Sequence, residues 1–445
     1  MTPSQETPAQ DRPVQDSPHQ DSPHQDAAVQ PPPGCPAHDP SSTGESAGPG
    51  GAVRMHSPRF QRDPAELYRL LRREYGPVAP ILLDDDVPAW LVLGYREVHY
   101  VTSNSELFAR DSRRWHAWDA IPANWPLMPY VTYTPSVLFK EGAEHQRRAG
   151  VITDVLSAVD QFELHSTSER VADALIDDFA GAGQADLMAD YAAQVPLRVV
   201  AGLFGLDLDQ IFQLERDMAG SLDEGPGALD AYMRIHATMT GLLEKGRSRP
   251  GPDVPSRMLA HPAGLEDEEI IQDMISIMAA GQQPTANWIG NTLRLMLTDD
   301  RFAVTLSGGR RSVGQALNEV LWADTPTQNF VGRWAARDTQ LAGVRIRKGD
   351  CLVLGLAAAN TDPEVQPDFS AGSVGNQAHL SFSHGEHRCP VPAPEMAEVI
   401  ARAAVEVLLD RLPDVMLTVP AEDVEWRPSV WMRGPSALPV EFTSI

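Results

Sequence analysis

The stretch His379-Leu-Ser-Phe-Ser-His-Gly-Glu-His-Arg-Cys389-Pro390 holds the densest set of chemically active side chains in this 445-residue chain. It ends just before an amphipathic run at about 393–411, so we expect a loop that leads into a long helix. The dipole of that helix and the neighbouring Arg388 both favour a thiolate over a thiol. The sequence therefore predicts an ionised Cys389, and an ionised cysteine is a good metal ligand.

Three interpretations of this stretch are compatible with its residues. One is a structural thiol in a loop with surface histidines. Another is axial ligation of a haem iron by Cys389. A further one is a zinc site made of His379, His384, His387 and Cys389. Structural zinc sites use Cys-x-x-Cys or helical His pairs, and the spacing here matches neither pattern.

The composition limits the class of protein. Hydrophobic residues make up 42% of the chain, which is enough for a sizeable core, and 61 acidic against 36 basic residues give a formal charge of −25. Such a surface repels nucleic acid and anionic lipid. No run of about 18 apolar residues and no secretory signal is visible, and three cysteines are too few for a disulfide framework. We expect a cytoplasmic protein with no nucleic-acid or membrane partner.

Two regions are expected along the chain. Residues 1–56, rich in Pro, Gln and Asp, predict a disordered tail, and residues 57–445 predict a single domain. The first part of that domain, about 57–110, is expected to be β-rich. It contains a helix at DPAELYRLLRREYGP and a β-hairpin formed by ILLDDD and AWLVLGY.

The rest of the chain is predicted to be mainly helical. Residues 141–300 predict several helices, including a long one at about 265–297 that contains Pro284 and is expected to kink there. A further helix is predicted at 311–323, and short strand-like runs follow it. Because helices outweigh strands and no βαβ alternation is visible, the predicted fold class is mainly α with minor β (α+β).

The pattern Phe382-x-x-Gly385-x-His387-x-Cys389 resembles the haem-binding loop of the cytochrome P-450 monooxygenases. The resemblance extends over roughly residues 57–445. It includes AWLVLGYREVHYVTSNSELFARD, DTQLAGVRIRKGDCLVLGLAAANTDPEV and RGPSALPVEF, which resemble the family's N-terminal sheet, a central segment and the C-terminal hairpin. It implies a haem-thiolate domain with the cytochrome P-450 fold, in which haem b lies between the I helix and the proximal Cys loop with its L helix.

The resemblance also implies which residues hold the haem. Cys389 would be the axial ligand, and Gly385 would let the backbone approach the ring. The remaining implied cofactor-binding residues are Phe382, His387, His145, Arg333, Ala280 and Gly281. The family's second C-helix arginine is Ala149 here, so Arg148, one position earlier, is expected either to replace it at a propionate or to be solvated.

Two departures from the family pattern concern catalysis and structure. The acid and threonine of the I helix correspond to Gln283 and Pro284, and the adjacent Thr285 would need a kink to take their place. These are the candidate catalytic residues.

The E-x-x-R motif reads Glu319-Val-Leu-Trp322, and Ser373 stands where its second arginine partner is usual. We expect the Trp322 indole to donate to Glu319, as a structural replacement of the ion pair. This resembles an actinobacterial subgroup with Trp in place of that arginine.

The implied function is a monooxygenase that oxidises a small apolar substrate with O2 and electrons from a ferredoxin and ferredoxin reductase. The expected substrate pocket contains Trp118, Thr325, Thr327, Val430 and Trp431, each of which could equally be ordinary core. A local basic face near Arg147, Arg148 and Arg388 is compatible with the acidic total. The alternatives are a haem-binding sensor or partner protein with weak or no turnover, and peroxide-driven oxidation.

Overall fold

The computed structural model describes residues 52–122, 124–221, 227–299, 302, 311–366 and 376–444. The predicted tail at 1–51 and Ser373 lie outside these residues. The tail prediction was wrong for residues 52–56. Val53–Arg54 form strand β1, which pairs in parallel with β2 (Val78–Leu82), and the neighbouring Ala52 and Met55 are buried. These apolar side chains bury surface against the sheet, which stabilises five residues more than the composition suggested.

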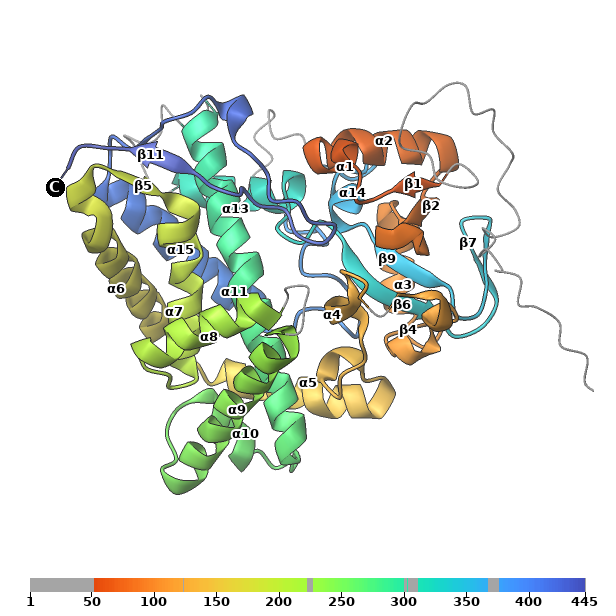
Figure 1. Ribbon diagram of the computed structural model, residues 1–445, viewed down its shortest axis with the longest axis horizontal. Helices are drawn as coiled ribbons and strands as arrows, with labels where there is room; N and C mark the ends of the chain where they lie inside the picture. The colour runs from red at the N-terminus through yellow and green to blue at the C-terminus, as the bar shows by residue number, and fades with distance from the viewer. Residues whose placement is uncertain are drawn as a thin grey trace, which may run out of the picture.

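A mixed six-stranded sheet occupies one side of the molecule (Figure 1). Its strand order is β1-β2-β3-β9-β6-β4, with β3 at Pro88–Val92, β9 at Cys351–Leu354, β6 at Phe330–Ala335 and β4 at Phe108–Ala109. Strands β2 and β3 form the predicted antiparallel hairpin. Cys351 is a buried strand residue, so one of the cysteines has a purely packing environment.

Three helices cover or extend this sheet: α1 (Pro58–Arg62), α2 (Pro64–Tyr75) and α3 (Tyr95–Ser103). Helix α2 begins where the Asp63 carboxylate accepts a hydrogen bond from the Glu66 N–H at 2.8 Å. It ends at Gly76, whose φ of 81° is accessible to glycine. Its apolar face buries Leu67 and Leu71, as the sequence pattern predicts.

The other side of the molecule is helical (Figure 1). Its main helices are α5 (Gly142–Ser157), α6 (Gln161–Phe179), α7 (Gln194–Leu203), α8 (Leu208–Ser221), α9 (Gly227–Ser248), α10 (Val254–Ala260), α11 (Asp267–Thr298), α13 (Arg311–Ala323) and α15 (Ala393–Arg411). The predicted class, mainly α with minor β, is confirmed.

Shorter elements complete the chain: α4 (Met128–Val131), α14 (Leu356–Asn360), the hairpin β7 (Thr339–Leu341) and β8 (Val344–Ile346), and the small sheet of β5 (Gln184–Asp186), β10 (Met416–Leu417) and β11 (Pro439–Glu441).

Helix α11 runs through the middle of the molecule and packs against α7, α9, α13 and α15 (Figure 1). A capping box of Glu266 and Glu269 starts it, which matches the acidic cluster in the sequence. The helix continues through Pro284 to Thr298. Because proline has no N–H, the carbonyl of Ala280 has no helical donor four residues later. The middle of α11 therefore exposes a backbone acceptor beside small side chains.

Candidate active site

The Cys loop, residues 379–392, is a tight turn held against α3. The Cys389 N–H donates to the Phe382 carbonyl at 3.0 Å, and Gly385 has a φ of +76°. A Cβ on Gly385 would lie 2.1 Å from the Thr102 carbonyl oxygen of α3. Glycine is thus required here by the approach of α3, whereas the family resemblance assigned this requirement to the approach of the ring.

The thiol of Cys389 is not ionised by the protein around it. Burial, followed by the charge of Glu395, raises its pKa to about 12. Arg388 is exposed to solvent and does not offset this effect. The prediction of a thiolate from helix dipole and Arg388 was therefore wrong, because desolvation of the sulfur outweighs both. A metal cation bound directly to the sulfur would deprotonate it.

The histidines of the Cys loop face three different neighbours. The His379 ring lies 5.9 Å from that of Trp322, His384 stacks on His99 at 3.8 Å, and His387 lies 3.9 Å from His145 of α5. Within the described ranges no group of three or more His, Cys, Asp or Glu residues is arranged to hold a metal ion. The zinc interpretation is wrong for these residues because their side chains diverge.

A buried cluster of nitrogen donors lies beside the Cys loop. Arg333 of β6 is 1% exposed, and its Nη1 donates to the Phe108 carbonyl at 3.4 Å. Three buried nitrogens have no hydrogen-bond partner in the described part of the chain: Arg333 Nε, His145 Nδ1 and His387 Nε2. Glu386, whose Oε1 lies 3.7 Å from His145 Nδ1, is the carboxylate nearest to that ring nitrogen.

The electrostatics of this cluster favour a bound anion. Burial lowers the pKa of His145, and burial with the charge of Arg333 lowers that of His387. Burial also lowers the pKa of Arg333 to about 10. Each lowered pKa indicates that the cationic form of the group lacks sufficient solvation or counter-charge. The cluster therefore fits the two carboxylates of a haem, and Ala279 and Ala280, accessible in the middle of α11, leave room beside the helix.

Arg148 does not belong to this cluster, nor is it solvated. Its side chain is 0% exposed, and it donates from Nε and Nη2 to Asp273 of α11 at 2.8 and 2.5 Å. It also donates to the carbonyls of Pro135 and Glu269. Both expectations for Arg148 were wrong, because Asp273, to which no local pattern connects it, is the stronger buried partner.

The centre of α11 places the three candidate catalytic residues in different environments. Gln283 Nε2 donates to Asn287 Oδ1 at 3.2 Å, one turn further along the helix. Gly281 faces α7, since a Cβ there would lie 3.3 Å from Val200, and Thr285 follows Gly281 by one turn and is buried. Helical periodicity thus places Thr285 on the same side as Gly281 rather than with Ala280 and Pro284. Its role as a replacement for the missing threonine stays a prediction.

Trp322 makes a different hydrogen bond from the expected one. Its indole N–H donates to the carbonyl of Asn376 at 3.0 Å, and the ring is buried. Glu319 is half-buried and has an interaction of its own. The expected Trp322–Glu319 hydrogen bond was therefore wrong, because the backbone leading into the Cys loop lies within reach of the indole. Trp322 instead connects α13 to that backbone.

The expected pocket residues lie in two connected groups. Trp118, Val430 and Trp431 belong to one apolar cluster. Thr327 bridges to Met432, and the amide of Asn291 on α11 donates to the carbonyls of Asp324 and Arg433. Thr325 is 1% exposed, and its Oγ1 has no partner among the described residues. The structure thus brings the 325–329 and 429–434 segments together beside α11.

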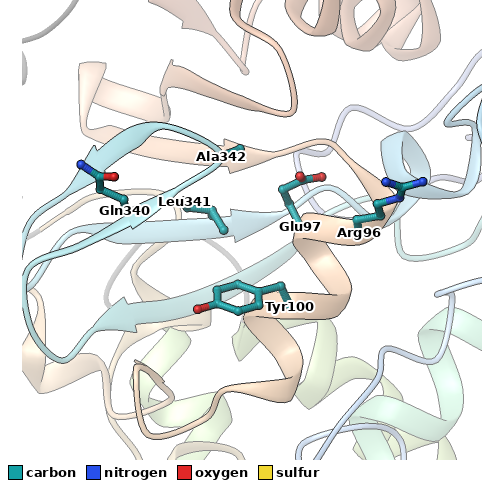
Figure 2. Close-up of a pocket in the computed structure, with 6 residues that line it drawn as sticks. All are labelled: Arg96, Glu97, Tyr100, Gln340, Leu341 and Ala342. Carbon is teal, nitrogen blue, oxygen red and sulfur yellow. The ribbon is translucent and has the colours of Figure 1, made fainter.

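A separate open pocket of about 390 Å³ lies between α3 and the β7–β8 hairpin (Figure 2). It is lined by Arg96, Glu97, Tyr100, Gln340, Leu341 and Ala342. None of the candidate site residues is among them, so we assign it no part in the chemistry.

Comparisons with known proteins give the class of protein that this chain resembles over most of its length. No family model matches the chain. Vitamin D(3) 25-hydroxylase of Pseudonocardia autotrophica is 27% identical over 394 residues, which cover 87% of this chain and 95% of that protein. Mycinamicin IV hydroxylase/epoxidase of Micromonospora griseorubida is 27% identical over 379 residues, or 83% and 93%. The solved structure of CYP154C4 from Streptomyces sp. W2061 superposes with a TM-score of 0.76 at 27% identity, covering 85% and 95%.

Fold and site together define a haem-containing oxygenase. The chain belongs to the cytochromes P450, of the kind found in bacteria, and is a P450-type monooxygenase whose cofactor is haem b. Within the described residues no helix is long and apolar enough to cross a membrane. The subgroup with Trp in place of the E-x-x-R arginine stays a prediction.

Proposed function

We propose that this monooxygenase transfers one atom of O2 to a mainly apolar small organic molecule, with electrons from a ferredoxin and its reductase in the cytoplasm. The second oxygen atom would leave as water, which consumes two electrons and two protons. The observation that supports the proposal most directly is the buried, donor-rich cluster of His145, Arg333 and His387 beside Cys389. Such a cluster is costly to bury unless an anion offsets it.

The residues around Cys389 would hold the haem from several elements at once. Cys389 would bind the iron through its sulfur, and His145, His387 and Arg333 would bind the propionates. Phe382, 5.9 Å from the ring of Trp288, packs the Cys loop against α11. When bound, the haem supplies the chemistry of oxygen activation and of oxygen-atom transfer.

On the α11 side, protons would be delivered by a different route from that of an acid–alcohol pair. Neither Gln283 nor Asn287 titrates, so these amides can hold and orient water but cannot donate a proton of their own. The Ala280 carbonyl, which lacks a helical donor, is a further acceptor for such water. We therefore propose that protons arrive through water bound at Gln283 and Ala280.

The substrate would lie against an aromatic wall with few polar contacts. Trp118, Val430 and Trp431 supply apolar surface. The relatives named above are a vitamin D3 hydroxylase and a mycinamicin hydroxylase/epoxidase. A screen should thus begin with sterol-like and macrolide-like molecules.

Docking of a ferredoxin would depend on a small patch. Of the three arginines expected near the Cys loop, Arg148 is buried and Arg147 is paired with Glu144 and Glu269. Arg388 is exposed, and Val391 close by is 44% exposed. These two residues mark the surface nearest to Cys389, so they are the proposed centre of the docking site.

The test is purification with ample haem, followed by spectroscopy. We expect about one haem per chain and a ferrous–CO Soret band of the thiolate type, which Cys389→Ala should abolish while Cys351→Ala leaves it unchanged. Colourless protein, or an unchanged band in Cys389→Ala, would refute the ligand assignment.

Turnover with a surrogate ferredoxin pair, compared with peroxide, would then test the electron source. Faster product formation with the ferredoxin pair is expected. Binding of haem without reduction by any donor, and without a spin-state shift for any compound, would favour the sensor alternative. Turnover with peroxide alone would favour peroxide-driven oxidation.

A further inference from the structure

Arg110, just after β4, is a buried cation to which the sequence analysis assigned no role, although it lies in the run that resembles the family's N-terminal sheet. It is 4% exposed, and its guanidinium donates to backbone carbonyls only: Nε to Leu138 at 3.0 Å, and Nη1 to Val331 at 2.9 Å and Gly332 at 2.5 Å. Within the described residues no ion pair joins it to a carboxylate. Its Nη2 makes no hydrogen bond to those residues and is not among the sealed-off polar atoms, so it borders open space.

The position of Arg110 adds a second guanidinium to the cluster beside the Cys loop. Burial, and then the like charge of Arg333, lower the pKa of Arg110 to about 9. The charge of Arg110 in turn lowers the pKa of both His145 and His387. The phenyl rings of Phe330 and Phe139 lie 5.0 and 5.9 Å from its guanidinium carbon and exclude water. Glu386 and Glu141 raise the pKa of Arg333, whereas no carboxylate of the described residues does so for Arg110. A further anion beside Arg110 would therefore offset a buried charge that is otherwise uncompensated.

We infer that Arg110 is a further propionate-binding residue, which supplies the positive charge that the usual C-helix arginine, replaced by Ala149, would have contributed. Its Nη1 is held by the carbonyls of Val331 and Gly332 on the same strand that carries Arg333. Strand β6 therefore positions both arginines so that they could bind the propionates of one haem. The inference rests on the haem assignment and goes beyond it, since the family resemblance implied no cofactor-binding role for this position.

This role has a thermodynamic signature that a merely structural role lacks. A structural Arg110 would stabilise the protein with and without haem by the same amount. A propionate-binding Arg110 stabilises the haem-bound form and leaves an uncompensated charge in the haem-free form. The gap in melting temperature between the two forms thus depends on Arg110 only if it binds the cofactor.

The experiment compares Arg110→Met with Arg148→Met as a matched control, because both replace a buried arginine. For Arg110→Met we expect haem transfer to excess apomyoglobin to be faster by about tenfold or more, with a smaller gap between haem-bound and haem-free melting temperatures. For Arg148→Met both melting temperatures should fall together. If Arg110→Met lowers both equally and haem loss is unchanged, the inference is wrong.

A second probe keeps the test decisive if Arg110→Met does not fold. Wild type and Arg110→Lys are reconstituted with haem and with haem dimethyl ester, which has no propionate charge. Arg110→Lys should lose haem faster than wild type, and the difference should vanish with the diester. An equal difference with both pigments would overturn the inference. Wild type that binds neither pigment would instead refute the haem assignment itself.

Discussion

Gly385 connects the Cys loop to α3 through backbone rather than side chains. Its positive φ and the 2.1 Å approach of the Thr102 carbonyl leave no space for a Cβ. Cys389 depends on this turn, since its N–H bonds to Phe382 just before it. Cys389 is half-buried within this turn, and desolvation is the main reason why its pKa is raised. At the scale of single residues, geometry and desolvation thus act together on the loop.

Gly385→Ala is expected to lower stability by about 3 kcal/mol or more, because it adds a steric clash to the cost of a left-handed conformation. Gly343→Ala is the matched control, since Gly343 has a φ of +81° with nothing within 4 Å of its Cβ position. The control should cost only about 1–2 kcal/mol. Chemical denaturation of both variants measures the difference, and equal losses would contradict the contact with α3.

Gln283 and Thr285 have different surroundings on α11, so we expect their substitutions to have different effects on catalysis. Gln283→Ala should lower the fraction of consumed electrons that appear in product by about tenfold, because water would lose its amide partner. Thr285→Ala should change that fraction by less than about twofold, since Thr285 is buried one turn after Gly281, which faces α7. Product and NADH consumption are measured together. A larger loss in Thr285→Ala would restore Thr285 as the catalytic residue.

Two helices, α5 and α11, are joined by the buried pair of Arg148 and Asp273. Asp273 also accepts a hydrogen bond from the Val137 N–H at 2.7 Å. Burial raises the pKa of Asp273, and Arg148 opposes that rise. At the scale of elements, one buried ion pair thus fixes how α5 packs against α11.

Removal of one member of this pair leaves a buried charge. We expect Arg148→Met to lower the free energy of unfolding by about 3–5 kcal/mol. The double variant Arg148→Met/Asp273→Leu should recover most of this loss, because neither charge remains. Urea denaturation of the single and double variants measures the coupling. Additive losses in the double variant would show that the pair is not coupled.

The whole molecule carries a formal charge of −25, while the proposed docking surface has a single exposed arginine beside the Cys loop. An acidic ferredoxin would therefore meet long-range repulsion and short-range attraction at Arg388. Salt screens the first effect over about 8–10 Å and affects the close contact less. The net charge thus acts on the rate of encounter rather than on the site itself.

Reduction by an acidic ferredoxin should accordingly become faster as salt is raised from low concentration to about 0.15 M, because repulsion is screened first. Arg388→Glu should slow reduction at both concentrations, and the exposed Arg96→Glu on α3 serves as the control. Stopped-flow measurement of haem reduction tests this. A rate that falls steadily with salt would show that local attraction dominates instead.

Local patterns in the sequence determined much of this protein. Helix α2, the β2–β3 hairpin, α11 and α15 follow from periodicity, caps and breakers that act over a few residues. The family resemblance of the Cys loop likewise depends on closely spaced residues. The fold class and the cofactor could therefore be predicted from the amino-acid sequence by itself.

Only the tertiary structure decided which distant side chains meet. Arg148 lies 125 residues from Asp273, Trp322 lies 54 from Asn376, and Arg110 lies 222 from Gly332. No local pattern predicts such a pair, because the partner of a buried polar group is determined by how distant segments pack together. The same reason applies to Cys389, whose pKa depends on desolvation by the whole fold, because a loop has no periodic pattern from which the burial of one residue could be predicted.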